Sequence, residues 1–142
     1  MLNSVILMGR IVKDPELRYS GTQNTPVASF TVACDRDYMK DGERPTDFIR
    51  CVAWRQTAEF IEHNFPKGSK IAITGRLQIR SYQDKSGARH EVAEVVADRA
   101  YFCEKGVKRD DTESRYPDKL ADLAAAYPDS FKEFSDEEEL PF

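Results

Sequence analysis

Residues 48–82, FIRCVAWRQTAEFIEHNFPKGSKIAITGRLQIRSY, decide the fold, because they join two strand patterns through a helix pattern. In residues 48–54, small apolar side chains alternate with aromatic and basic ones, the period of a strand with one buried face. Residues 56–64 carry apolar side chains at helical spacing and end before Pro66-Lys67-Gly68, which predicts a short helix. Residues 70–82 alternate again, so a second strand is expected.

The two predicted strands have chemically different faces. In the first strand, the side chains expected to face the core are Ile49, Cys51 and Ala53. Those expected to face the other side are Phe48, Arg50, Val52 and Trp54. In the second, the core set is Ile71, Ile73, Gly75, Leu77 and Ile79, and the opposite set is Thr74, Arg76, Gln78, Arg80 and Tyr82. Each strand therefore is expected to present rings and arginines outward.

The flanking sequence supplies three more strand patterns. Residues 5–12 read as a strand bent at Gly9, which the Asp14-Pro15 pair ends, and the polar residues 20–25 form a loop. Residues 27–34 alternate, and residues 90–102 follow a turn at 84–87. Three strands, a helix and two strands is the order of an OB-fold, a five-stranded barrel. A generic β-sandwich or SH3-like barrel is the alternative, but neither needs a helix at that position.

Charge divides the chain into a body and a tail. Residues 1–106 hold 16 Lys and Arg against 14 Asp and Glu, whereas residues 107–142 hold 5 against 11. The predicted organisation is an OB-fold domain over 1–106, a flexible linker over 107–135 and an acidic tip over 136–142. The fold class is therefore all-β with one short helix, with a disordered acidic C-terminal tail.

The tip places four carboxylates before two large apolar side chains: Asp136, Glu137, Glu138, Glu139, Leu140, Pro141 and Phe142. Such a segment cannot fold alone, because adjacent carboxylates repel and two side chains bury too little surface. It is typical of a ligand for a basic, apolar pocket on another protein. A plain solubility tail is the alternative, although solubility does not require Leu140 and Phe142.

The outward faces suit single-stranded nucleic acid. Phe48 and Trp54 flank Arg50 on one strand, and Tyr82 follows Arg76 and Arg80 on the other, while Tyr38 in the charged loop before residue 48 adds a further ring. Rings stack on unpaired bases and guanidinium groups neutralise phosphates. The alternative is that these aromatic side chains pack against a partner subunit.

Other function classes lack their motifs. The sequence has no phosphate-binding glycine loop, no H-E-x-x-H and no nucleophile set beside a His, so no enzyme is expected. Cys34, Cys51 and Cys103 lack the spacing of a zinc site or disulfide framework, and His63 and His90 are expected at the surface. No cofactor, metal or membrane span is predicted, and the expected compartment is the cytoplasm, at the nucleoid.

The chain resembles the bacterial single-stranded DNA-binding protein family over residues 1–104 and again at the tip. The matching motifs are Leu2-Asn3-x-Val5-x-Leu7-x-Gly9-Arg10, Lys13-Asp14-Pro15-Glu16-Leu17-Arg18-Tyr19, Asp47-Phe48-Ile49-x-Cys51-Val52-x-Trp54, Lys67-Gly68-Ser69 and Gly75-Arg76-Leu77-Gln78-x-Arg80-x-Tyr82. The resemblance implies an OB-fold, a homotetramer, and single-stranded DNA wrapped over aromatic and basic surfaces without sequence preference.

The resemblance also assigns residues. Stacking positions correspond to Tyr38, Phe48, Trp54 and Tyr82, and family phosphate contacts to Arg50, Lys67 and Arg80; with Arg55 and Arg76 these form the predicted phosphate-binding set. Gln78 stands where some relatives have a basic residue. The tip corresponds to the family segment that docks on helicases, nucleases, primase and recombination or repair factors. The short, glycine-free linker departs from the family pattern and would suit a phage or mobile-element copy.

Three hypotheses compete. The first is a non-catalytic single-stranded DNA binder that recruits proteins of replication, recombination and repair. The second is a different OB-fold module, either a primosome component or an RNA-binding protein. The third is a structural barrel subunit whose aromatic side chains are buried in an oligomer interface.

Overall fold

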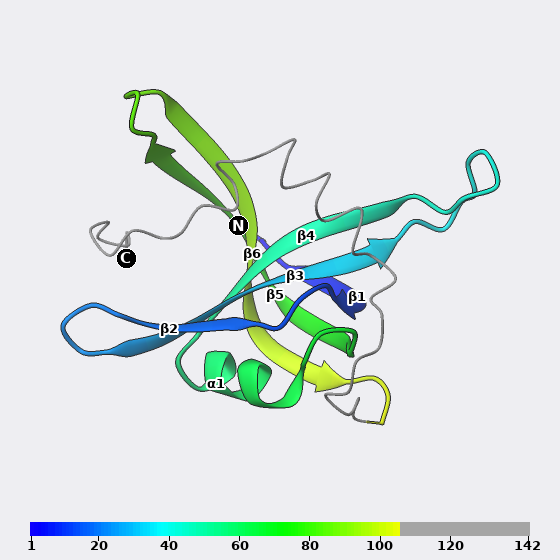
Figure 1. Cartoon of the computed structure of the whole chain (residues 1–142), viewed down its shortest axis with the longest axis horizontal. Helices are drawn as coiled ribbons and strands as arrows, with labels where there is room; N and C mark the ends of the chain where they lie inside the picture. Colours follow the sequence, from blue (N-terminus) through cyan, green and yellow to red (C-terminus); the bar gives the residue numbers. More distant parts are fainter. Residues whose placement is uncertain (106–142) are drawn as a thin grey trace.

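The computed structural model describes residues 1–105, so the predicted boundary at residue 106, the linker and the acidic tip lie outside the described residues. The elements are β1 (Val5–Ile11), β2 (Glu16–Ser20), β3 (Thr25–Asp35), β4 (Thr46–Trp54), α1 (Arg55–Asn64), β5 (Lys70–Gln83) and β6 (Arg89–Phe102). Figure 1 shows a barrel with α1 beneath it, from which the β2–β3, β3–β4 and β5–β6 hairpins project.

The sheet closes into a barrel. Pairing runs β1–β5–β6–β4–β3–β2, and an additional β1–β3 pairing returns the sheet to its first strand. The β4–β6 pairing is parallel and the other pairings are antiparallel. With α1 between β4 and β5, this closed barrel of β1, β3, β4, β6 and β5 confirms the predicted OB-fold.

The core lies inside the barrel and under α1. The predicted inward residues Cys51, Ala53, Ile71 and Ile73 are buried, and α1 adds Ala58 and Ile61. Burying an isoleucine side chain contributes about 1.5–3 kcal/mol. Because the interior positions are filled by side chains, any ligand site lies on the outer surface or in the loops.

The strand β2 was not predicted. Residues 16–20 lack a clear alternation, and only Leu17 among them packs against the core. They pair with β3 from Glu16 opposite Ser29 to Ser20 opposite Thr25. Pro15, directly before this strand, has no backbone N–H to donate. The tight turn at the end uses Gly21 with a φ of 73°, a conformation that favours glycine. β2 is therefore an additional strand outside the closed barrel.

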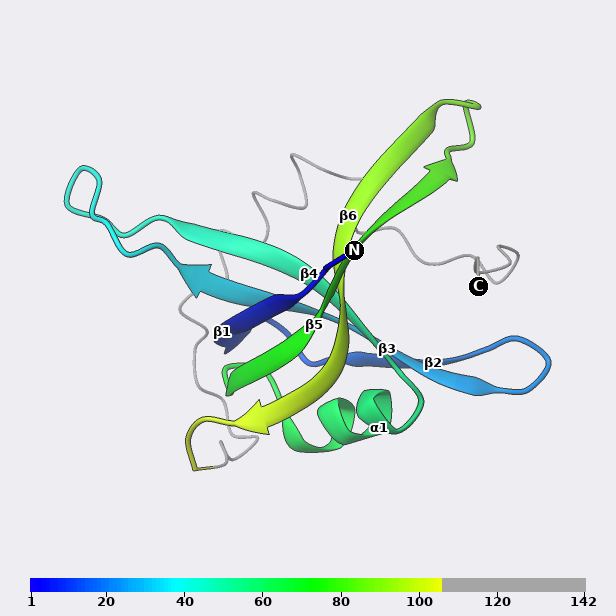
Figure 2. The same cartoon turned by 180° about the vertical axis from the view of Figure 1, so that it is seen from behind.

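The β5–β6 hairpin corrects one expectation. Leu77 and Ile79 were predicted to face the core, but they are 46% and 57% exposed. The alternation continues along β5, but β1 pairs with this strand only as far as Gly75, and β4 pairs with β6 only from Val95. Beyond those points the hairpin is a two-stranded arm outside the barrel (Figures 1 and 2), so its inward face meets solvent.

A bulge marks the start of this arm. Thr74 pairs with Arg99 but Gly75 pairs with Ala97, so β6 has one extra residue at this point. A side chain at position 75 would collide with the carbonyl oxygen of Val96. A bulge bends the strands and increases their twist, which is consistent with the arm leaving the barrel here.

Candidate nucleic-acid interface

The outer face of β4 carries three of the predicted residues at alternate positions. Phe48 is half-buried and packs against Val12 and Ala33, and Trp54 is half-buried where β4 meets α1. Arg50 lies between them in sequence. Packing at the base of a ring restricts its motion while leaving part of it accessible, which suits a stacking surface.

The β3–β4 hairpin holds Tyr38 beside an ion pair. Arg36 Nη1 donates a hydrogen bond to Tyr38 Oη at 2.7 Å, and the guanidinium carbon is 6.0 Å from the ring centroid. Arg36 also binds both carboxylate oxygens of Asp47, with Nη2–Oδ1 at 2.7 Å and Nε–Oδ2 at 3.0 Å. These hydrogen bonds raise the pKa of Arg36 and lower the pKa of Asp47. Tyr38 remains 52% exposed, so its ring is both oriented and accessible.

A second ion pair lies between β5 and β6. Arg80 Nε is 3.4 Å from Glu94 Oε1, and the two side chains are only 12% and 7% exposed. The β4–β6 register, with Cys51 opposite Val95, brings Arg50 beside Glu94 on the neighbouring strand. Burial lowers the pKa of Arg50, and the charge of Glu94 opposes that shift. One carboxylate thus lies among two of the predicted phosphate-binding arginines.

Tyr82 has neighbours in two directions. The Arg80 guanidinium carbon is 5.7 Å from its ring centroid. Across the hairpin, the His90 ring stacks on it at 5.3 Å with an interplanar angle of 28°. His90 was expected at the surface, and 39% of its side chain is exposed, but it also has a polar partner, since its Nε2 lies 2.8 Å from Asp84 Oδ2. The arm therefore holds this ring in a defined environment.

The remaining predicted cations are spread over the surface. Arg76 is exposed on β5, 4.0 Å from Asp98. Arg55 is exposed at the start of α1 with a φ of 55°. Lys67 is exposed in the turn before β5, where its backbone N–H donates to Asp14. The structure joins Arg50, Arg80 and Tyr82 in one neighbourhood and leaves these three cations outside it.

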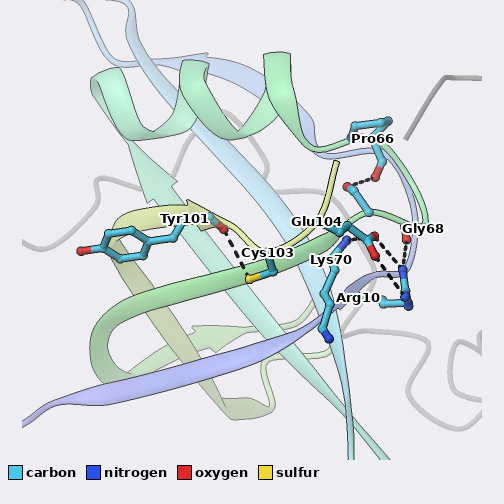
Figure 3. Close-up of polar contacts among 8 residues, drawn as sticks. Arg10, Pro66, Gly68, Lys70, Tyr101, Cys103 and Glu104 are labelled. Carbon is cyan, nitrogen blue, oxygen red and sulfur yellow. Dashed lines mark hydrogen bonds and ion pairs between the residues drawn. The ribbon is translucent and has the colours of Figure 1, made fainter. Parts of the chain in front are cut away.

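The end of β6 is fixed to the barrel by a separate polar cluster (Figure 3). Arg10 Nη1 donates to Glu104 Oε1 and to the Gly68 carbonyl, both at 2.9 Å. Glu104 also accepts from the backbone N–H of Lys70 at 3.0 Å. The hydrogen bond from Arg10 is the main cause of the lowered pKa of Glu104. Arg10 thus has a structural partner, and the chain leaves the barrel at a fixed point beside the α1–β5 turn.

Other kinds of site find no support in residues 1–105. This part of the chain contains no group of three His, Cys, Asp or Glu side chains placed to hold a metal. Cys34, Cys51 and Cys103 are all free, and burial raises the pKa of the Cys51 thiol. None of the described helices is long and apolar enough to cross a membrane.

Known proteins resemble this chain over its whole length. A single-stranded DNA-binding protein of Caldanaerobacter subterraneus subsp. tengcongensis is 42% identical over 151 aligned positions, and single-stranded DNA-binding protein 1 of Streptococcus pyogenes serotype M18 is 41% identical; both alignments cover all of both chains. A single-stranded DNA-binding protein of Clostridium tetani is 45% identical over 76% of this chain and 74% of its own length.

A family model gives the same result. The model of the single-strand binding protein family matches residues 2–103, which includes every described strand and α1. The proteins of this family are DNA-binding proteins and not enzymes. With this match and full-length relatives above 40% identity, the chain belongs to the single-strand binding protein family.

Proposed function

We propose that this protein binds single-stranded DNA without sequence preference, on the outer face of β4 and along two hairpin arms. These are the β3–β4 hairpin that carries Tyr38 and the two-stranded part of the β5–β6 hairpin that carries Tyr82. The observation that carries the proposal is that each arm holds a tyrosine against an arginine, at 6.0 Å for Tyr38 and 5.7 Å for Tyr82. The outer face of β4 adds Phe48 near the β3–β4 arm and Trp54 at the end that meets α1. Membership of the single-strand binding protein family supports the same function.

The chemistry of these residues fits unpaired bases. Each stacked base contributes about 1–3 kcal/mol, and any base serves because all have a π-face. We assign phosphate contacts to Arg50, Arg55, Lys67 and Arg76, and add Arg36, which is exposed beside Tyr38. Arg80 has its charge compensated by Glu94, so we expect it to act mainly by holding Tyr82.

We also propose that the protein acts as a homotetramer. Two surfaces leave large apolar side chains exposed: Leu77 and Ile79 on one face of the β5–β6 arm, and Leu2, Ile6 and Met8 just before and along the outer face of β1. Exposed apolar side chains that cluster in this way mark protein interfaces, and further copies of the chain would bury these two surfaces, which no part of residues 1–105 covers. Ile79→Asp is expected to shift the sedimentation mass towards dimer or monomer, and an unchanged tetramer would remove Ile79 from the interface.

We propose a second role for the acidic tip, residues 136–142, which is to bind partner proteins. This part of the proposal rests on the sequence alone, since the tip lies outside the described residues. Its carboxylates, Leu140 and Phe142 suit a basic, apolar pocket on proteins of DNA replication, recombination and repair. The protein would then work in the cytoplasm at the nucleoid. Deleting 136–142 is expected to leave oligo-dT binding intact or slightly tighter, because an anionic segment competes with DNA for the arginines.

Intrinsic fluorescence tests the central function, because Trp54 is the single tryptophan of the chain. Titration with oligo-dT is expected to quench Trp54 strongly, and Trp54→Ala to weaken binding by about tenfold or more, the loss of one stacked base. Tight binding without quenching would remove Trp54 from the interface. Tighter binding of duplex DNA or of RNA at matched salt would contradict the function itself.

A further inference from the structure

His90 is a partly buried side chain to which the proposed function gives no role. It lies directly opposite Tyr82 in the β5–β6 register, and the two rings stack at 5.3 Å. Its Nε2 lies 2.8 Å from Oδ2 of Asp84. A ring that stacks on a neighbour and is also hydrogen-bonded to a carboxylate is well placed to hold that neighbour in position.

Asp84 is itself fixed by the turn between β5 and β6. Its Oδ1 accepts hydrogen bonds from the backbone N–H groups of Ser86 and Ala88, both at 2.9 Å, and from the Ser86 hydroxyl at 2.5 Å. The hydrogen bonds from Ser86 and His90 hold the pKa of Asp84 well below its usual range. One oxygen of this carboxylate therefore closes the turn while the other holds the imidazole.

Tyr82 needs such support because it lies on the two-stranded part of the arm. There, no third strand of the described chain pairs with β5 or β6. A side chain on a two-stranded arm keeps rotamer freedom, which it must lose when it stacks on a base, and that loss reduces affinity. Contacts from Arg80 along the strand and from His90 across it restrict the ring before DNA arrives.

We propose that His90 is a positioning residue for DNA binding: its ring, held by Asp84, fixes Tyr82 in the orientation that stacks on a base. This inference rests on the proposed stacking role of Tyr82. In this role His90 makes no phosphate contact, so its replacement leaves the salt dependence of binding unchanged. A direct phosphate contact would instead lower the slope of log K against log salt by about 0.7 on a single strand.

The first test measures the affinity of the full chain for fluorescein-labelled oligo-dT at several salt concentrations. His90→Ala is expected to bind about fivefold more weakly, the loss of one aromatic pair, with the same salt slope. His63→Ala is the matched control, because His63 is the other histidine and is exposed at the end of α1. An unchanged affinity for His90→Ala, or a reduced slope, would overturn the inference.

Two further variants separate the ring from the hydrogen bond. His90→Phe keeps a ring that can stack on Tyr82 and is expected to retain most of the affinity. His90→Gln keeps a donor for Asp84 but has no ring, so it is expected to bind as weakly as His90→Ala. The reverse order would show that closure of the turn matters and that stacking does not. Circular dichroism of each variant establishes that the barrel is folded.

A double-mutant cycle with Tyr82→Ala shows whether His90 acts through Tyr82. In the Tyr82→Ala background, His90→Ala is expected to have no further effect, whereas a second fivefold loss would overturn the positioning role. If Tyr82→Ala alone binds like the wild type, the stacking role of Tyr82 fails and the inference fails with it. If Tyr82→Ala weakens binding but His90→Ala does not, the stacking role stands and only the inference fails.

Discussion

The two hairpin arms are built from the same three kinds of side chain in different surroundings. On the β3–β4 arm, Tyr38 accompanies an Arg36–Asp47 pair in which both side chains are 47% exposed. On the β5–β6 arm, Tyr82 accompanies an Arg80–Glu94 pair that is almost fully buried. Each arm thus holds a ring beside an arginine whose charge a carboxylate balances.

Burial decides what each ion pair does. An exposed pair is screened by water and salt, so it contributes little to stability and its arginine can exchange the carboxylate for a phosphate. A buried pair has already lost its hydration, so removing one partner leaves an uncompensated charge in a poorly solvated place. We therefore expect the Tyr38 arm to respond to changes through DNA binding and the Tyr82 arm through folding.

The largest effect is expected from Glu94→Ala. This change leaves both Arg50 and Arg80 without their shared carboxylate, and it should lower the free energy of unfolding by about 3 kcal/mol. Asp47→Ala, its counterpart on the exposed pair, should unfold close to wild type. Urea unfolding followed by circular dichroism, at one fixed protein concentration, measures both. Similar losses for the two variants would contradict the contrast between the arms.

A smaller effect is expected on the salt dependence of DNA binding. Arg36→Ala removes an exposed cation beside Tyr38 and should reduce the slope of log K against log salt by about 0.7. Arg80→Ala should leave the slope near its wild-type value, because Glu94 already compensates that charge. Arg10→Ala, which removes a cation held by Glu104 away from both arms, serves as the control. A slope that changes for Arg80 and not for Arg36 would reverse our assignment of the two roles.

The smallest effect concerns pH and the turn of the β5–β6 arm. The folded pKa of Asp84 is lowered from 3.8, so its contribution to stability is present above that value and is lost as the pH falls through the folded pKa. The side-chain carboxyl carbon resonance of Asp84 should therefore show no protonation step from pH 7 down to pH 4 and should titrate only at lower pH. Protonation of this carboxyl already between pH 5 and 4 would show that Asp84 is not held by the turn.

Much of the barrel was predictable from alternation. The buried sets Ile71 and Ile73, and Cys51 and Ala53, follow the period of two, and the helix between the strands fixed the fold class. Leu77 and Ile79 were misassigned because alternation reports only which face of the strand a side chain is on, and not whether that face is buried. Whether another layer covers that face depends on where the strand leaves the barrel, which the local pattern does not contain.

The candidate site was only partly predictable. Rings and arginines on outer faces were visible in the sequence, but the carboxylates that accompany them were not. The alternation of β6 could have indicated that His90, Val92 and Glu94 share a face, because they occupy every second position. Pairing Glu94 with Arg80 also requires the β5–β6 register, which runs without interruption from Gln83 opposite Arg89 to Gly75 opposite Ala97.

Ultraviolet cross-linking to oligo-dT, followed by mass spectrometry of the linked peptides, tests the central claim most directly. We predict cross-links at Tyr38 and Tyr82 on the two arms and at Phe48 and Trp54 on β4, and a loss of the Tyr82 link in the Tyr82→Ala variant. Tyr19 and Tyr101 are internal controls, since both are about as exposed as Tyr38 but lie on β2 and at the end of β6. Cross-links at these two tyrosines and none on either arm would contradict the account.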